Sequence, residues 1–178
     1  MKSLLKAARF AAEKHSTQKR KNVAGSPYIN HPLEVADHLA TVGQVTDEDI
    51  LIAALLHDTV EDTQTTREEI ADHFGETVAS LVMECTDDKS LEKAERKRLQ
   101  IVNAPKKSDE AKMIKLADKT CNLRSILTDP PKDWDTKRQR EYFEWARQVC
   151  DGLKGVNAAL EAELDTVLKE GLNRFRTQ

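Results

Sequence analysis

One short segment of the sequence concentrates the residues best suited to chemistry. Residues 55–62 read Leu-Leu-His-Asp-Thr-Val-Glu-Asp, so an apolar run ends in one histidine and three carboxylates. On a continuous helix, side chains four residues apart share a face, which would place His57 over Glu61 and Asp58 over Asp62. Four ionisable groups at the end of a core helix are costly unless a partner compensates them. Because imidazole and carboxylate are ligands for Mn, Fe or Zn, the segment predicts a divalent-metal site.

Two further residues extend this set, and each of these positions also has an ordinary structural interpretation. His31 closes a loop directly before a predicted helix start, where its ring could point inward or make a simple capping contact. Asp118 lies in a predicted helix, where an ion pair with a neighbouring lysine is the alternative to metal binding. For His57 and Asp58 the alternative is a solvated helix end with a capping histidine. Asn122 follows Asp118 by one turn on the same face.

The elements that must position these residues are predicted to be helical. Apolar residues recur with helical spacing, and no convincing alternating strand, internal repeat or low-complexity segment is found. The third helix is apolar all round and is therefore expected to be buried. A loop is expected from about residue 18 to residue 31. The predicted helices are 3–15, 33–42 after Pro32, a third capped by Thr46, one from a capping box at Thr66 to Phe74, 77–85, 92–103, 108–127 capped by Ser108, and 135–172 with a break near Gly152 and Gly155.

Composition agrees with one helical domain. A chain of 178 residues is in the usual range for a single domain, and 39% hydrophobic with 33% charged residues suits a soluble globular protein. Eight aromatic residues and only six glycines disfavour a many-stranded sandwich or barrel. The net charge of −3 creates no overall field that would attract nucleic acid or an anionic membrane. We therefore predict a single all-α domain.

The distribution of charge is more informative than its sum. Residues 46–76 hold ten acids and one arginine, whereas residues 89–107 hold seven basic residues and two acids. These two segments are expected to face a dication and a polyanion, respectively. The basic runs are short and have no interleaved aromatic residues for stacking on bases, so nucleic acid is not an expected partner.

Other features of the sequence have ordinary interpretations. Three scattered cysteines without a CxxC spacing fit a reducing cytosol, and no signal peptide or membrane-spanning run is found, so a cytoplasmic location is expected. Most lysines of residues 89–107 are interpreted as a solvated helical face. The remaining side chains are predicted as surface or packing histidines (His15, His38 and His73) and as core or groove-wall residues (Trp134 and Trp145).

Taken in order, the motifs resemble those of a known family. His31, then His57-Asp58, then Asp118 are similar to the H…HD…D signature of the HD-domain metallophosphohydrolases. Within that family the chain most resembles the hydrolase domain of RelA/SpoT-type proteins, and above all the small stand-alone alarmone hydrolases. The resemblance covers roughly residues 5–155 and implies one HD-type helical bundle for residues 1–178. The segments that carry it are Arg20-Lys21, Gly25–Pro32, Ala54–Thr63, Phe74-Gly75, Thr86–Lys89, Glu95–Arg98, Lys115–Lys119, Asn122–Arg124 and Glu141–Trp145.

The resemblance implies a role for each matching residue. The metal ligands, for one Mn²⁺ per chain, would be His31, His57, Asp58 and Asp118. The pair that handles the attacking water would be Glu61 and Asp62. The residues that contact the nucleotide would be Arg20, Lys21, Asn122, Arg138 and Tyr142. One departure is visible at Thr120-Cys121, where a Leu-Tyr pair is expected, and it concerns the base or ribose pocket rather than the metal set.

The reaction implied by the resemblance is hydrolysis of a small nucleotide. A guanosine-3′,5′-bis(diphosphate) 3′-diphosphatase removes pyrophosphate from the 3′ position of ppGpp or pppGpp and leaves GDP or GTP. One alternative is removal of the 2′-phosphate of NADPH, as in animal members of the family, or hydrolysis of another nucleotide. A second alternative is an inactive alarmone-binding domain, but all six metal and water-handling residues are present. The preference among ppGpp, pppGpp and NADPH, the metal in the cell and the oligomeric state stay open at this point.

Overall fold

The computed structural model describes residues 1–175, and helices joined by loops make up this range. It contains ten α-helices and one 3₁₀ helix, and its only strand-like features are isolated bridges between Lys19 and Pro27 and between Asn22 and Pro131. The prediction of an all-α fold is confirmed. The helices are α1 (Lys2–Lys14), α2 (Asn30–Thr41), α3 (Glu48–Leu56), α4 (Thr59–Asp62), α5 (Arg67–Phe74), α6 (Glu76–Cys85), α7 (Lys93–Asn103), η1 (Ala104–Lys106), α8 (Asp109–Thr128), α9 (Thr136–Asp151) and α10 (Ala158–Arg174).

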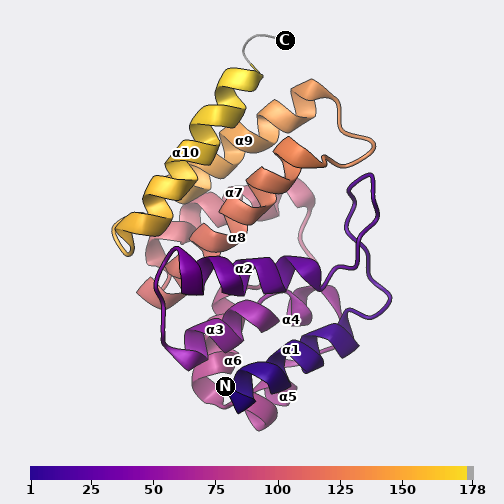
Figure 1. The fold of residues 1–178 in the computed structure, drawn as a ribbon, viewed down its shortest axis with the longest axis vertical. Coiled ribbons are helices and arrows are strands. Elements are labelled where there is room, and N and C mark those ends of the chain that lie inside the picture. The colour runs from indigo at the N-terminus through magenta and orange to yellow at the C-terminus, as the bar shows by residue number, and fades with distance from the viewer. Residues whose placement is uncertain (176–178) are drawn as a thin grey trace.

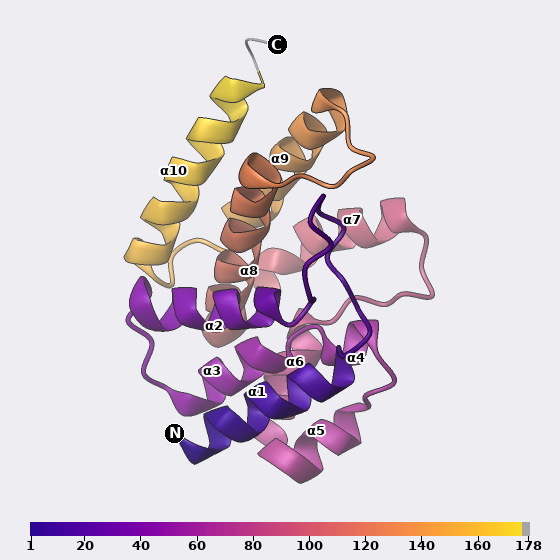
Figure 2. The same ribbon diagram turned by 45° about the vertical axis from the view of Figure 1, so that its right-hand side comes forward.

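The helices form two groups that meet at α2. Figure 1 shows α1, α3 and α5 in the lower half and α8, α9 and α10 in the upper half, with α2 lying across the molecule between them. Helix α2 packs against both α3 and α8, while α10 packs against α8 and α9. The turned view in Figure 2 brings α7 forward, and α7 packs against α9. Residues from both groups can therefore reach one site beside α2.

Helix α3 is the centre of the lower group. Every residue from Ile50 to Leu56 is buried, as expected for a helix that is apolar on all faces. The predicted cap at Thr46 is wrong by one position. Asp47 has the extended backbone of a cap, and its side chain accepts hydrogen bonds from the N–H groups of Asp49 and Ile50.

Other predicted boundaries also meet the structure closely. Ser108 and Thr66 cap their helices as predicted, and the last helical region is broken between Asp151 and Ala158. Helix α2 starts earlier than predicted, at Asn30 rather than at Pro32 or Leu33, so His31 lies inside its first turn. Helical backbone therefore fixes the His31 position more firmly than a loop would.

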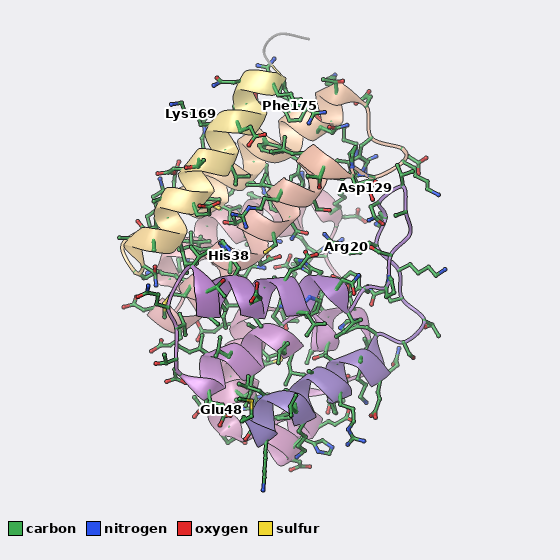
Figure 3. All side chains as sticks on the ribbon, in the orientation of Figure 1. Arg20, His38, Glu48, Asp129, Lys169 and Phe175 are labelled. Carbon is green, nitrogen blue, oxygen red and sulfur yellow. The ribbon has the colours of Figure 1, made fainter. Side chains whose placement is uncertain are left out.

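The segment between α1 and α2, residues 15–29, is called the site loop here. It folds back on itself because Tyr28 N–H donates to the Gln18 carbonyl and Arg20 N–H donates to the Ser26 carbonyl. Gly25 turns the chain with a φ of +60°, a region that favours glycine. The site loop is held beside the end of α8, since the N–H of Val23 donates to a carboxylate oxygen of Asp129 at 3.0 Å. Figure 3 shows Arg20 and Asp129 on this same side of the molecule.

Within residues 1–175, no helix combines the length and the apolar character that a membrane span requires.

Candidate metal centre and substrate cleft

The turn between α3 and α4 carries the first two candidate ligands. The helix is interrupted at His57 and Asp58, so the continuous helix that would stack His57 over Glu61 is not formed. Asp62 N–H still donates to the Asp58 carbonyl at 2.9 Å, which preserves a single turn. This break separates the two candidate ligands, which lie on the turn, from Glu61 and Asp62, which lie on α4.

His57 is completely buried and has one free ring nitrogen. Its Nδ1–H donates to the Ala54 carbonyl at 2.7 Å, so Nε2 holds the lone pair. Nε2 is without a hydrogen-bond partner and lies 3.2 Å from Oδ2 of Asp58. A buried lone pair normally has a partner. This ring is therefore fixed in the tautomer that binds a metal through Nε2.

His31 approaches the same point from the first turn of α2. It is buried, and its Nε2 lies 3.2 Å from Oδ1 of Asp118 and 3.8 Å from Oδ2 of Asp58. The His31 and His57 rings meet edge to face with centroids 5.3 Å apart. Two imidazoles and two carboxylates thus converge from three separate elements, α2, the α3–α4 turn and α8.

Asp118 is buried in the middle of α8 and has two differently occupied oxygens. Oδ2 lies 2.9 Å from the Lys115 ammonium and 3.2 Å from that of Lys119. Oδ1 accepts a hydrogen bond from Asn122 at 2.6 Å and faces His31. Burial alone would raise the pKa of Asp118, but the two lysines hold it well below its ordinary value. The ion pair with lysine that the sequence offers for Asp118 is therefore present on Oδ2, and Oδ1 faces His31, where it could bind a metal ion.

The donor set fits a divalent metal ion. The ligand atoms of His31, His57 and Asp118 all lie within 4.8 Å of one another, and all three residues are buried. Oδ2 of Asp58 accepts a hydrogen bond from the Tyr28 hydroxyl at 2.6 Å, which orients it beside both histidines. Nitrogen and carboxylate oxygen donors together suit Mn, Fe or Zn. The buried His-His-Asp group can thus hold a metal ion, and Asp58 is placed to join it.

Glu61 and Asp62 of α4 differ in how their oxygens are used. Oε2 of Glu61 accepts the N–H of Asp87 at 3.0 Å. Burial raises the pKa of Glu61 above its ordinary value. Asp62 accepts on both oxygens, from Gln18 at 2.8 Å and from the Lys89 ammonium. Oε1 of Glu61 lies 3.9 Å from the Lys89 ammonium, beyond hydrogen-bond distance, whereas both oxygens of Asp62 accept hydrogen bonds.

A cleft of about 590 Å³ opens beside this centre. Four of the five predicted nucleotide contacts line it, namely Arg20, Lys21, Asn122 and Tyr142. Arg138, the fifth, lines a neighbouring cavity of about 500 Å³ together with Lys93 and Lys97. Both cavities share the rings of Trp134 and Tyr142, and the Arg138 guanidinium lies 4.8 Å from the Trp134 ring centre.

The remaining sequence interpretations have mixed outcomes. Trp134 lines the 590 Å³ cleft, as predicted for a groove-wall residue. Cys121 and Arg20 both line a third cavity of about 380 Å³. His73 is exposed, as predicted for a surface histidine. Lys89 departs from the solvated face expected for residues 89–107, because it binds Asp62.

Several residues at the site escaped sequence reasoning. They are Gln18, Tyr28 and Lys89, which contact the carboxylate of Asp62 or of the candidate ligand Asp58. Lys115 and Lys119, by contrast, are the neighbouring lysines whose ion pair with Asp118 the sequence offers as the alternative to metal binding. Gln18 and Tyr28 depend on the path of the site loop, and Lys89 on the segment between α6 and α7, which no local pattern in the sequence predicts.

Comparison with known proteins identifies a family and several close relatives of the chain. A family model described as an HD domain matches residues 7–144. The guanosine-3′,5′-bis(diphosphate) 3′-pyrophosphohydrolase MESH1 of Xenopus tropicalis is 56% identical over 162 residues, which are 91% of this chain and 90% of that protein. The protein of the same name from Homo sapiens is 54% identical over 167 residues, which are 94% and 93% of the two chains.

A solved structure is similarly close. It is described as a metazoan ortholog of SpoT that hydrolyzes ppGpp and plays a role in starvation responses. Its TM-score is 0.93 at 48% sequence identity, and the match covers 96% of each chain. The family match spans more than half of the sequence, and these relatives align over most of their own length. The chain therefore belongs to the HD-domain family.

Proposed function

We propose that this protein hydrolyses the 3′-pyrophosphate of ppGpp and pppGpp, yielding GDP or GTP and pyrophosphate. The observation that carries the proposal is the convergence of His31, His57 and Asp118 beside Glu61 and Asp62. These residues lie at the edge of a cleft lined by lysine and arginine side chains. Relatives that are 53–56% identical over most of the chain bear the name of this activity. Residues 1–175 share one hydrophobic cluster, which supports a single hydrolase domain.

The metal site is proposed to take one Mn²⁺ per chain. Its ligands would be Nε2 of His31 and His57 and one oxygen each of Asp58 and Asp118, as supported by the donor distances above. When bound, a divalent cation of this kind polarises a phosphoryl oxygen and makes water acidic enough to attack near neutral pH. Lys115 and Lys119 keep Oδ2 of Asp118 engaged, so that its Oδ1 is the oxygen presented to the histidines.

Glu61 is proposed to take the proton of the attacking water. Its Oε1 is not used by the Asp87 N–H, and its raised pKa brings it closer to the working pH of a general base. Asp62, with hydrogen bonds to both oxygens, is proposed to orient the water. A positioned carboxylate of this kind contributes roughly 10²–10⁴-fold in rate.

The substrate is proposed to occupy both neighbouring cavities. Arg20, Lys21 and Asn122 would contact the nucleoside and its 3′-pyrophosphate in the larger cavity. Tyr142, which lines both cavities, and Arg138, which lines the smaller one, would contact the 5′-phosphates together with Lys93 and Lys97. Water attacks the phosphorus bonded to the 3′ oxygen, that P–O bond breaks, and the 3′ oxygen leaves as the hydroxyl of GDP. The oxygen of the water ends on the pyrophosphate.

Product analysis tests this function directly. Purified protein with Mn²⁺ should convert ppGpp into GDP and pyrophosphate in equal amounts, and ¹⁸O from labelled water should appear only in the pyrophosphate. Chelation, Asp58→Ala and Glu61→Ala should each abolish the conversion. Intact ppGpp after incubation with the Mn²⁺-loaded protein would overturn the proposal.

The same assay separates the other candidate substrates. NADPH and deoxynucleoside triphosphates should be tested beside ppGpp and pppGpp at equal concentration. The value of kcat/KM should be highest for ppGpp or pppGpp. Faster release of phosphate from NADPH would transfer the proposal to that substrate. A cytosolic setting is proposed as well, because Cys85, Cys121 and Cys150 are all free thiols.

A further inference from the structure

His15, at the end of α1, is a buried histidine that the metal centre does not use. It is only 2% exposed, and its Nδ1 lies 2.7 Å from Oε1 of Gln18. The N–H of Gln18 also donates to the His15 carbonyl at 3.0 Å. Sequence reasoning treats this residue as a surface or packing histidine. The contacts instead make it the anchor of the site loop.

The first chain of contacts from His15 ends on Asp62. The amide Nε2 of Gln18 donates to Oδ2 of Asp62 at 2.8 Å. An ionised carboxylate can only accept, so the amide nitrogen of Gln18 must face Asp62 and its oxygen must face His15. The His15 Nδ1 therefore carries the proton of this hydrogen bond. His15 thus determines which way the Gln18 amide is turned.

The second chain of contacts from His15 ends on Asp58. The imidazole stacks against the Tyr28 ring with centroids 4.9 Å apart and an angle of 35° between the planes. The Tyr28 hydroxyl donates to Oδ2 of Asp58 at 2.6 Å. One side chain therefore supports two separate carboxylates, Asp62 at the end of α4 through a hydrogen bond and Asp58 in the α3–α4 turn through a ring contact.

We propose that His15 is a positioning residue for both carboxylates: its Nδ1–H orients Asp62 through Gln18, and its ring orients the candidate ligand Asp58 through Tyr28. This inference rests on the proposed function for its effect on rate. It reaches further, because it predicts that the two effects can be separated by changing one side chain in two ways. Lys89, the other side chain that binds Asp62 among the described residues, is exposed on a different segment and reaches Oδ1, not the Oδ2 that Gln18 holds.

Two substitutions of His15 distinguish the contacts that end on Asp62 from those that end on Asp58. His15→Phe keeps an aromatic ring against Tyr28 but removes the Nδ1–H, whereas His15→Asn keeps an N–H donor near the same point but removes the ring. We expect His15→Phe to lower kcat by roughly 10–100-fold with Mn²⁺ affinity and KM unchanged, because Asp62 loses an oriented charge-assisted bond. We expect His15→Asn to weaken Mn²⁺ binding by roughly 10-fold and to retain kcat at saturating Mn²⁺.

A double-mutant cycle adds a measurement that a merely structural role would not move. Gln18→Leu removes the middle of the first chain without touching the His15 ring. If the two residues act in series, His15→Phe combined with Gln18→Leu should lower kcat no further than either change alone. Gln18→Leu also supplies the rate measurement on its own if His15→Phe does not fold.

Exposed His73 offers matched controls. His73→Phe and His73→Asn change the same residue types on the surface, and both should leave kcat and Mn²⁺ affinity unchanged. Circular dichroism and thermal melting establish that each variant is folded. The inference is overturned if His15→Phe and His15→Asn lose kcat to the same extent and Mn²⁺ affinity to the same extent. It is also overturned if the losses of kcat in the double-mutant cycle are additive, or if neither variant loses kcat or Mn²⁺ affinity. If the wild-type protein leaves ppGpp intact, the proposed function fails, and the contrast in Mn²⁺ affinity between His15→Asn and His15→Phe still decides the inference.

Discussion

Lys115 places its ammonium nitrogen 2.9 Å from Oδ2 of Asp118, on the side of that carboxylate away from the two candidate ligand histidines. Lys119 contacts the same oxygen, and all three side chains are at least nine-tenths buried. Two buried ammonium groups therefore share one carboxylate as their nearest counter-ion. The charge of Asp118 serves the fold as well as the metal centre.

Asp118→Asn should consequently destabilise the protein much more than Asp58→Asn. Removing one side of a buried ion pair costs about 3–5 kcal/mol, whereas the Asp58 side chain is 17% exposed and has the Tyr28 hydroxyl and the His57 imidazole as partners rather than two buried ammonium groups. The folded-state pKa of Asp118 is depressed, so its contribution is fully present above the ordinary Asp value of about 3.9 and is lost only as the pH falls through the lower folded-state value. Urea unfolding of metal-free protein at pH 7 measures both variants. Equal losses would show that the lysines do not depend on Asp118.

Removing the metal should lower the thermal stability as well as the activity. The donor atoms of His31, His57 and Asp118 are already gathered, so a divalent cation should bind the folded chain and not the unfolded one. At a free Mn²⁺ concentration 100 times its Kd, such binding stabilises by about 2.7 kcal/mol. A thermal melt with and without chelator should show this shift in the wild type and in His73→Ala, and no shift in His57→Ala. An identical shift in His57→Ala would place the ion elsewhere.

Glu61→Gln should stabilise the metal-free protein at neutral pH while it abolishes hydrolysis. Burial raises the folded-state pKa of Glu61, so the folded chain favours the protonated form. The stability that Glu61 contributes is present below its ordinary pKa of about 4.3 and is lost as the pH rises through the folded value. Glutamine removes this loss, and its side-chain oxygen can still accept the Asp87 N–H.

The measurement is the melting temperature of both proteins between pH 4 and pH 8. The advantage of Glu61→Gln should be absent at the acidic end and should grow as the pH rises. A difference that stays constant with pH would mean that Glu61 is ionised at no cost in the folded protein.

The sequence alone predicts the helical fold well because local patterns encode it. The apolar stretch Ile50–Leu56 predicts a buried helix, and Ser108 and Thr66 cap helices where capping chemistry places them. The one-residue error at Asp47 arises because Thr46 and Asp47 can both cap α3, and α2 starts early, at Asn30, without a side-chain cap. Tertiary contacts decide such competitions, and they do not appear in a local pattern.

The site is less predictable than the fold, for a physical reason. His31, His57 and Asp118 can be identified because metal binding restricts the residue types that serve it. His15 and Gln18 have no such restriction: each is a common polar residue, and its role depends on the site loop bringing it to Asp62, which is 44 positions from Gln18 in the sequence. Residues that orient a ligand through another side chain are visible only in three dimensions.

The proposed phosphate contact at Arg138 yields the last prediction. Arg138 lines the smaller cavity and lies against Trp134, whereas Arg140 points away and pairs with Glu144 at 2.9 Å. A charge-assisted hydrogen bond contributes about 1.5–3 kcal/mol, so Arg138→Gln should raise KM for ppGpp by roughly 10–100-fold with little change in kcat. Arg140→Gln removes the same charge two residues further along α9 and should leave KM unaltered. Steady-state kinetics at several NaCl concentrations completes the test, because the wild-type KM should rise with salt more steeply than that of Arg138→Gln. Equal effects of the two substitutions would mean that Arg138 and Arg140 attract the substrate only through their summed positive charge, and that Arg138 makes no specific contact with it.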